Sequence, residues 1–406
     1  MFQKIKLGKV CTIESGSREK GGAISTGIPS IGGEQINANG EISINKMKYI
    51  SEEHYSKMRQ GILVQGDVLI VKDGATTGKT AFYEGNFEKA AINEHVFILR
   101  ANNNILPRLL YYVVISDKFQ QKIQTMKKGL IGGINLSIEN IEINIPNGIQ
   151  EQEEIIQVLD TMSDIIRLRE ECISHAQDLI PALFQEMFKE INKYNIDVRQ
   201  LVNMGIIEKP LDGNHGELHP KASDYVSQGI PFVMASDLIN GKVDIYNCNF
   251  ISEEQAKTLR KGFAKKDDVL ISHKGTIGRT AIVQDIDTDY IVLTPQVTYY
   301  RILDDSRINK YFLKSYFDST YFQNILLSKA QKGATRAYVG ITEQLSLPIY
   351  LPDIKQQEQF ANKVREINSY IEEQQEELEN AKQMFQSLLH HAFTGELTRK
   401  KYGGGN

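Results

Sequence analysis

Apolar positions recur with a beat of four and three residues along two long stretches of the chain, residues 150–194 and 353–397. This average spacing of 3.5 residues is typical of a helix that packs one seam against a partner helix. Adding 205 to each number carries the first series onto the second, and one polar position, Arg169 or Gln374, interrupts both at the same place. The pattern predicts two long helices whose seams consist of Ile155, Leu159, Met162, Ile166, Ile173, Ile180, Leu183, Phe360, Val364, Ile367, Ile371, Leu378, Phe385 and Leu388.

A different pattern fills the segments before these helices, where short apolar runs alternate with glycine and asparagine turn signals. The run Asp-Val-Leu-Ile at 67–70 returns at 268–271, and the glycine-punctuated loop at 74–80 returns at 275–280. Arg100 matches Arg301 at the end of a later strand-like run in each half. The order globule, helix, globule, helix therefore occurs as a duplication of one unit, because a solenoid would need more repeats of a shorter period.

These matches predict an α+β fold with an internal pseudo-two-fold repeat. Two similar mixed α/β globules, residues 1–149 and 195–352, are separated by two long antiparallel coiled-coil helices, and residues 398–406 form a flexible tail. Within the first globule, the apolar face of residues 106–126 predicts a single helix. Within the first long helix, Pro181 predicts a kink or a restart, because proline removes a backbone hydrogen bond.

Composition changes this picture little. The hydrophobic content of 41% and charged content of 24% are ordinary for a globular protein, and three cysteines show no paired spacing. Residues 1–10 lack the apolar run of a signal peptide, so a cytoplasmic location is expected. The net charge of −4 is unevenly distributed: residues 1–149 hold 18 Lys+Arg against 14 Asp+Glu, whereas residues 150–195 hold 4 against 10. A local basic patch that contacts phosphates is therefore permitted, although the totals do not argue for one.

None of the motifs that would indicate catalysis has the residues or the spacing that its chemistry requires. The loop at 74–80 has three residues between its first glycine and Gly-Lys-Thr, whereas a nucleotide-binding phosphate loop needs four. His215 and His219 lack the glutamate spacing of a zinc protease, so no metal site is expected there. No nucleophile–base pattern appears, and we expect a non-catalytic chain that binds no cofactor itself. The repeated glycine loop suits either a plain hairpin turn or a contact with a phosphate or a base edge.

Taken in order, the motifs resemble the specificity subunit of type I restriction-modification enzymes. The resemblance rests on the Gly-Asp-apolar runs with their glycine-rich followers, on Lys-Gly-Ala-Thr-Arg at 332–336, and on a proline shortly before each long helix. It also rests on Glu151-Gln152 and Gln357-Glu358 at the helix starts, and on the ending Ala-Phe-Thr-Gly-Glu-Leu at 392–397. Each motif is weak alone, but their order occurs twice and covers almost the whole chain.

The resemblance implies that each globule is a target-recognition domain for one half of a bipartite double-stranded DNA site. It implies that the helices set the gap and dock two modification subunits, which use S-adenosylmethionine to methylate adenine at N6. Motor-nuclease restriction subunits, which use ATP and Mg²⁺, complete such complexes. Each half would read few base pairs, and linking two halves raises selectivity through effective concentration.

The repeated loops and the basic segments after the shorter helices provide the candidate DNA contacts, since small residues beside cations allow close approach to DNA. The candidates are Lys72, Thr76, Thr77, Lys79, Lys127, Lys128, His273, Lys274, Thr276, Arg279, Lys332, Thr335 and Arg336. Two other functions remain open at this point. A coiled-coil adaptor whose globules bind proteins would show no salt-dependent, sequence-selective DNA affinity, and a self-contained enzyme would be active without partners.

Overall fold

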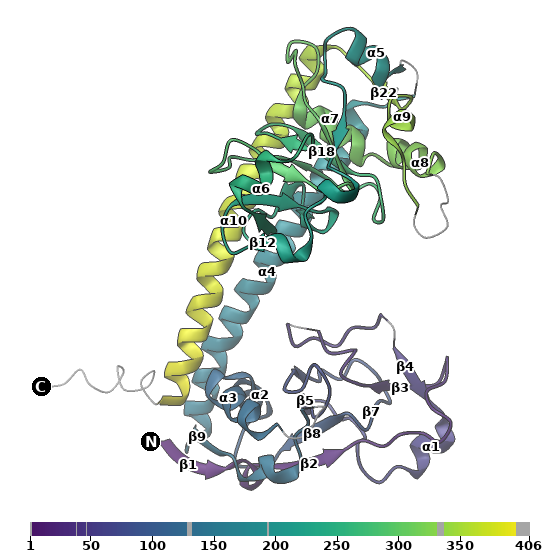
Figure 1. Cartoon of the computed structure of the whole chain (residues 1–406). Helices are drawn as coiled ribbons and strands as arrows, with labels where there is room; N and C mark the ends of the chain where they lie inside the picture. The colour runs from purple at the N-terminus through teal and green to yellow at the C-terminus, as the bar shows by residue number, and fades with distance from the viewer. Residues whose placement is uncertain are drawn as a thin grey trace, which may run out of the picture. The chain divides into compact units, whose positions relative to one another are not determined.

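The computed structural model describes residues 2–37, 39–45, 47–127, 132–192, 195–330 and 337–394. The chain forms two compact units (Figure 1). The first unit contains residues up to 170 together with those from 376 onward, and the second contains residues 171–375. Each unit thus combines a globule with parts of the same two helices, α4 (Ile149–Met187) and α10 (Ile354–Thr394).

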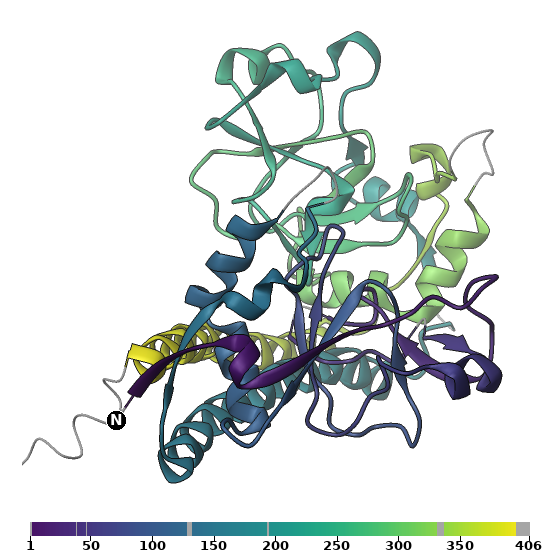
Figure 2. The same ribbon diagram turned by 90° about the horizontal axis from the view of Figure 1, so that it is seen from below.

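Within each unit, the segments of the two long helices lie side by side (Figures 1 and 2). In the first unit, Ile155 near the start of α4 shares a core with Leu389 near the end of α10, so the helices run antiparallel there. In the second unit, Phe184 near the end of α4 packs against Phe360 near the start of α10. All fourteen predicted seam residues are buried or half-buried. The helix does not restart at Pro181, which lies exposed inside the continuous α4.

A buried glutamine fixes the start of each long helix. The amide of Gln152 accepts a hydrogen bond from Leu106 N (2.8 Å) and donates to the carbonyls of Asn104 and Pro146. Gln357 makes the corresponding bonds with Asn309 N (2.9 Å), Arg307 O and Pro352 O. Because these bonds satisfy backbone groups of the globule, the glutamine of the repeated helix-start motif joins each globule to its helix.

The globule of the first unit has a four-stranded antiparallel sheet in the order β2-β8-β5-β6 and a smaller sheet in the order β4-β3-β7. Strand β1 pairs with β9 beside the long helices. The strands are β1 (Phe2–Lys6), β2 (Cys11–Ser15), β3 (Ile28–Ile31), β4 (Lys48–Ile50), β5 (Val68–Val71), β6 (Thr80–Phe82), β7 (Ala91–Ile92), β8 (Val96–Ala101) and β9 (Glu142–Pro146). The shorter helices are α1 (Glu52–Lys57), α2 (Pro107–Ile115), α3 (Asp117–Met126) and the 3-10 turns η1 (Leu7–Lys9) and η2 (Leu136–Asn140).

The second globule repeats this plan with additions. Its main sheet has the order β11-β21-β18-β19, and its smaller sheet grows to five strands, β12-β16-β13-β20-β17. Its strands are β10 (Asn195–Asp197), β11 (Leu211–Asp212), β12 (Tyr225–Val226), β13 (Ile230–Val233), β14 (Leu238–Ile239), β15 (Lys242–Val243), β16 (Asn249–Ile251), β17 (Phe263–Ala264), β18 (Val269–Ser272), β19 (Thr280–Ile282), β20 (Ile291–Leu293), β21 (Val297–Tyr300) and β22 (Pro348–Tyr350). Its helices are α5 (Val198–Asn203), α6 (Glu253–Lys257), α7 (Lys310–Asp318), α8 (Thr320–Ser328), α9 (Ile341–Gln344) and the 3-10 turns η3 (Gly216–Leu218), η4 (Ala222–Asp224) and η5 (Ala235–Asp237).

The prediction of a single helix over residues 106–126 is wrong. Ser116 adopts an extended conformation (ψ 143°) that ends α2 and begins α3, and its hydroxyl donates to Val113 O at 2.6 Å. Ser319 breaks α7 from α8 with the same backbone and the same bond to Tyr316 O (2.6 Å). The apolar faces of both short helices point to one core, so periodicity alone does not reveal the break.

One buried ion pair braces each main sheet. Arg100 on β8 donates to both oxygens of Asp67 at 2.8 Å and to Glu14 at 2.9 Å. Asp67 is almost completely buried, and its carboxylate also accepts from the backbone of Val64. The aspartate of the repeated Gly-Asp motif is therefore a bidentate arginine anchor. The same set of bonds, at 2.7–2.9 Å, joins three residues of the second unit, Arg301, Asp268 and Glu208.

Candidate nucleic-acid interface

The glycine loop of the first unit is a hairpin connection between β5 and β6. Gly74 (φ +91°) and Gly78 (φ +96°) adopt the left-handed conformation that glycine tolerates best. The backbone N and the hydroxyl of Thr77 both donate to Gly74 O, at 3.2 and 2.7 Å. Thr77 is buried, so its predicted place at the DNA surface is corrected: its side chain closes the turn. Thr76 and Lys79 are half-buried beside it.

Lys72 is anchored at the base of this loop. Its ammonium donates to Ser15 Oγ at 3.0 Å and lies 5.1 Å from the ring centroid of Phe97. The following residue, Asp73, pairs with His95 through Nδ1 at 2.5 Å. Lys72 O also accepts from Ile134 N at 2.7 Å, which ties the loop to the segment that follows α3. Of the two predicted lysines in that segment, Lys127 is half-buried and Lys128 lies outside the described residues.

The corresponding loop of the second unit presents more of its side chains. Thr276 and Arg279 are exposed and Lys274 is half-buried. The guanidinium of Arg279 donates to the carbonyls of Ala235 and Ser236, both at 3.3 Å, and its backbone N donates to Ser272 Oγ at 2.9 Å. Arg279 is thus held against η5 at the edge of the loop. The remaining predicted contacts, Lys332, Thr335 and Arg336, lie outside the described residues.

His273 was predicted as a surface contact, but the structure places it inside. Its Nδ1 lies 2.9 Å from Val339 O, and burial lowers the pKa of its imidazole. The backbone of Val339 donates in turn to His273 O at 2.9 Å. His273 therefore fastens the glycine loop to the chain before α9, as Lys72 O and Ile134 N do in the first unit. Its hydrophilic character on a glycine loop suggested exposure, whereas the tertiary contacts bury it.

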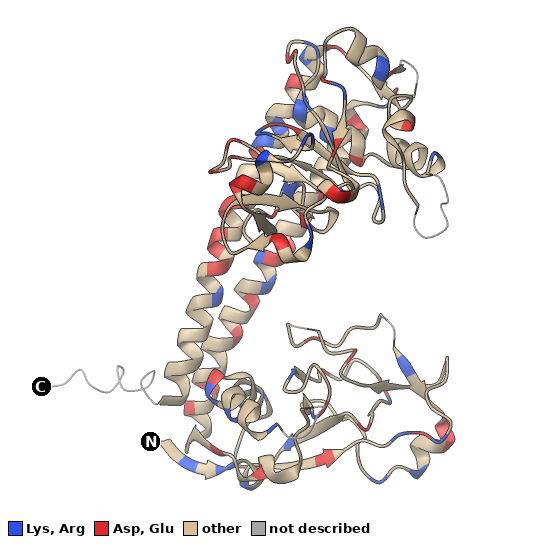
Figure 3. Cartoon of the chain, viewed as in Figure 1, with Lys and Arg blue, Asp and Glu red and all other residues tan. Residues whose placement is uncertain are grey.

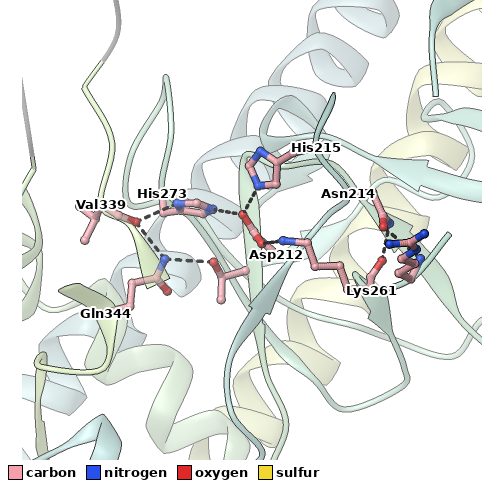
Figure 4. Close-up of polar contacts among 9 residues, drawn as sticks. Asp212, Asn214, His215, Lys261, His273, Val339 and Gln344 are labelled. Carbon is pink, nitrogen blue, oxygen red and sulfur yellow. Dashed lines mark hydrogen bonds and ion pairs between the residues drawn. The ribbon is translucent and has the colours of Figure 1, made fainter. Parts of the chain in front are cut away.

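A polar cluster that the sequence did not reveal surrounds Asp212 (Figure 4). Its carboxylate pairs with Lys261 Nζ and, at 2.7 Å, with His215 Nε2, while His273 Nε2 lies 3.9 Å away. Burial raises the pKa of Asp212, but the bonds from Lys261 and His215 lower it by more, so the net direction is down. The sequence offers no signal for this cluster, because only the paired strands show that Asp212 faces Thr298 as Ser15 faces Phe97 in the first unit.

Basic and acidic residues are interspersed along the ribbons of both units (Figure 3). Any DNA contact must therefore come from local groups and not from a large field of one sign. Among the residues that the structure describes, no group of three or more His, Cys, Asp or Glu side chains is arranged to hold a metal ion. In the same part of the chain, no helix has the length and apolar character that crossing a membrane requires.

Comparison with known proteins gives a consistent result. The model of the type I restriction modification DNA specificity domain matches residues 1–175. The type I restriction enzyme MjaVIII specificity subunit of Methanocaldococcus jannaschii is 23% identical over 359 residues, which are 84% of this chain and 81% of that protein. The EcoBI specificity subunit of Escherichia coli is 26% identical over 219 residues, 52% of this chain and 44% of that protein.

Two solved structures share the fold. A chain from a structure of complex assembly and conformational transition in a type I R-M system superposes with a TM-score of 0.59 at 18% identity. The match covers 97% of this chain and 98% of that one. The S subunit of the type I restriction-modification system from M. genitalium gives a TM-score of 0.54 at 13% identity, covering 97% and 96% of the two chains. The likeness extends over both globules and both long helices.

Proposed function

We propose that this chain, which belongs to the specificity subunits of type I restriction-modification systems, selects the DNA sequence on which its complex acts. Each globule reads one half of a bipartite site. The observation that carries the proposal is the duplication of one braced sheet with two different loop surfaces. Arg100 and Arg301 hold the same frame in both units, whereas the residues at the loop ends differ. Two such surfaces in one chain suit a site with two unlike halves.

The two long helices act in this proposal as an antiparallel coiled coil with a pseudo-two-fold repeat that sets the gap between the half-sites. The matched seams at an offset of 205 residues support it, as does the antiparallel packing inside each unit. A rigid spacer turns two weak contacts into one selective contact by raising the effective concentration of the second globule.

The helices also dock the modification subunits. The seam residues already pack inside the chain, so a partner must use the outer faces of the helices. Val158, Ile165 and Leu168 of α4 are exposed apolar side chains within the first unit, at spacings of seven and three residues. Such a stripe on one helical face suits a partner helix. S-adenosylmethionine then belongs to the modification subunits, which methylate adenine at N6, and ATP with Mg²⁺ belongs to restriction subunits where these join.

Mapping of methylated sites tests the proposal. The full chain would be produced together with a modification subunit of a type I system in a host whose genome lacks that modification. The expected result is a single split motif with adenine modified in both halves and a fixed gap between them. An intact, active complex that methylates without any motif would overturn the proposal and favour a protein-binding adaptor.

A second test addresses the loops. Lys274→Ala combined with Arg279→Ala should weaken DNA binding and flatten its dependence on salt, because each lost phosphate contact reduces the number of counterions released. Arg199→Ala, which removes an exposed arginine of α5 in the same unit, is the matched control. A salt slope for the double variant equal to that of the wild type would exclude phosphate contact by these two side chains.

A further inference from the structure

We propose that Asp212 is a positioning residue that holds Lys261 and His215 as the base-reading pair of the second unit, with guanine as the base that Lys261 contacts. The inference rests on the proposed reading of DNA by each globule, and it assigns chemistry to one half-site. Asp212 itself would touch no DNA. Its role is to fix the direction of two side chains, the half-buried Lys261 and the exposed His215.

The geometry separates a buried anchor from one half-buried and one exposed side chain. The Asp212 side chain is only 6% exposed, whereas those of Lys261 and His215 are 32% and 54% exposed. Both bonds reach the same carboxylate, one oxygen serving Lys261 and the other serving His215. A long lysine side chain normally loses considerable rotamer freedom when it binds a base. Here the buried carboxylate restricts Lys261 before any ligand arrives, so less entropy remains to be lost.

The backbone around the pair is fixed as well. Asn214 Nδ2 donates to Lys261 O at 2.7 Å, and Asn214 Oδ1 accepts from Arg260 N at 3.0 Å. The chain beside each member of the pair passes through a glycine, Gly213 or Gly262, at a point where a Cβ would collide with neighbouring backbone. The two side chains therefore sit on two segments that cross in close contact, and neither segment can shift alone.

A buried histidine, His273, lies beside the carboxylate of Asp212. His273 Nε2 lies 3.9 Å from Asp212 Oδ2 and has no hydrogen-bond partner, although its side chain is only 5% exposed. Its other nitrogen, Nδ1, is held by Val339 O. A buried polar atom without a partner is costly, and such atoms are uncommon in folded proteins. The Asp212 cluster therefore includes a buried nitrogen that lies 3.9 Å from the carboxylate and makes no hydrogen bond within the described structure.

The chemistry of the pair favours base edges over phosphates. The negative charge of Asp212 offsets the positive charge of Lys261, so the cluster attracts phosphates weakly, while the remaining N–H groups of the ammonium still donate. A carboxylate only accepts, so His215 Nε2 carries a hydrogen, and in the neutral ring Nδ1 is then an acceptor. A lysine that donates in the major groove matches O6 and N7 of guanine, and the neighbouring acceptor suits an exocyclic amine.

The first unit has different chemistry at the equivalent place. Ser15 occupies the position of Asp212 in the strand register, and it accepts from Lys72 at the base of the glycine loop. A neutral hydroxyl neither offsets the charge of a lysine nor gathers two donors. The two units are thus expected to select different bases.

Asp212→Asn in the full chain, assembled with its modification subunit, gives the sharpest test. The amide keeps the shape of the carboxylate but loses its charge, which leaves the charge of Lys261 without its offset. Discrimination at one half-site should fall by about tenfold or more, the range of one good base contact. Affinity for non-specific duplex should rise, and the salt slope should steepen by about 0.9, as for one added phosphate contact. A merely structural fault would weaken both kinds of binding.

The measurements are fluorescence anisotropy with the mapped duplex and with duplexes in which each half is scrambled, together with methylation mapping. Lys261→Met, which keeps length without charge, should relax the same half and lose its preference for guanine there. Ser15→Ala is the matched control and should leave that half unchanged. Unaltered discrimination in Asp212→Asn, or equal loss at both halves, would overturn the inference. Absence of any motif for the wild type would instead contradict the proposed function.

Discussion

The two globules share a frame and differ at their loop ends. In each, an arginine at the end of the last-but-one strand of the globule donates to both oxygens of the aspartate of the Gly-Asp turn, at 2.7–2.9 Å, and to a glutamate through its remaining nitrogen. At the end of the same sheet, one unit places Ser15 and Lys72 together, and the other gathers His215, Lys261 and His273 around Asp212. Burial constrains the frame, whereas the loop ends are free to differ.

The junctions between globule and long helices differ as well. In the second unit, the rings of Phe184, Phe188 and Phe360 lie 4.9–5.5 Å apart, an aromatic cluster with edge-to-face contacts. In the first unit, Asp160 of α4 accepts from Arg108 Nε at 2.7 Å and from the hydroxyl of Tyr112. Burial, the first cause, and the bond to Asp160 raise the pKa of Tyr112, so its hydroxyl stays protonated. The two globules thus contact the long helices through different kinds of side chain.

Removal of the arginine anchor should have the largest effect. Arg301→Ala leaves the buried carboxylate of Asp268 without its partner, and breaking such a pair costs about 3–5 kcal/mol in the free energy of unfolding. Arg100→Ala should cost a similar amount in the first unit. Urea denaturation of the full chain measures both, with the exposed Arg260→Ala as control. If Arg301→Ala is no more destabilising than Arg260→Ala, the anchor does not brace the sheet.

The next largest effect should come from adding a side chain at the glycines where two backbone segments are in close contact. A Cβ on Gly213 would lie 1.9 Å from Leu293 O, and one on Gly16 would lie 2.2 Å from Ile92 O. Backbone cannot yield as a flexible side chain does, so Gly213→Ala and Gly16→Ala should each cost about 3 kcal/mol. Gly148→Ala is the control, because its Cβ would meet nothing closer than 3.9 Å. Thermal unfolding followed by circular dichroism would show whether both crossings are as tight as their geometry indicates.

The two units should also differ in how their stability depends on pH, although this effect is smaller than the two above. Burial lowers the pKa of His273, so the folded chain binds fewer protons than the unfolded chain just below the ordinary histidine value of about 6.5. This contribution to stability is present above that value and is lost as the pH falls through the folded pKa. Lys72 holds the equivalent position in the first unit. His273→Asn should reduce the acid sensitivity, and denaturation midpoints between about pH 7 and 5 measure it.

That measurement has an internal reference. His219 in the same unit also has its pKa lowered by burial and by His215, and it remains in the His273→Asn variant. Asp212, on one side of His273, raises its pKa, whereas His215 and Lys274 lower it. A variant with the full acid sensitivity of the wild type would assign the pH dependence to these other groups.

The sequence predicts the long helices, the duplication and the buried strands because their signal is periodic and local. It does not predict the break at Ser116, since the apolar face continues through it, nor the burial of His273, which depends on Val339 66 residues away. The cluster around Asp212 joins positions separated by up to 61 residues. The repeat identifies Arg100 and Arg301 as matching residues, but only the folded structure shows that they bond to Asp67 and Asp268.

Repetition alone does not measure importance, and one pair of contacts tests this. Lys57 pairs with Glu53 on α1, and Lys257 pairs with Glu253 on α6, so each unit carries one such pair, although alignment of the N-caps Ser51 and Ser252 shifts the two pairs by one residue. All four side chains are well exposed, so water screens each pair and the entropy of two long side chains opposes it. Lys57→Ala and Lys257→Ala should therefore shift the melting temperature by about 1–2 °C at most. A shift comparable with that of Arg301→Ala would mean that these exposed ion pairs stabilise the globules as much as the buried arginine anchors do. The fixed part of each globule would then include surface residues of α1 and α6.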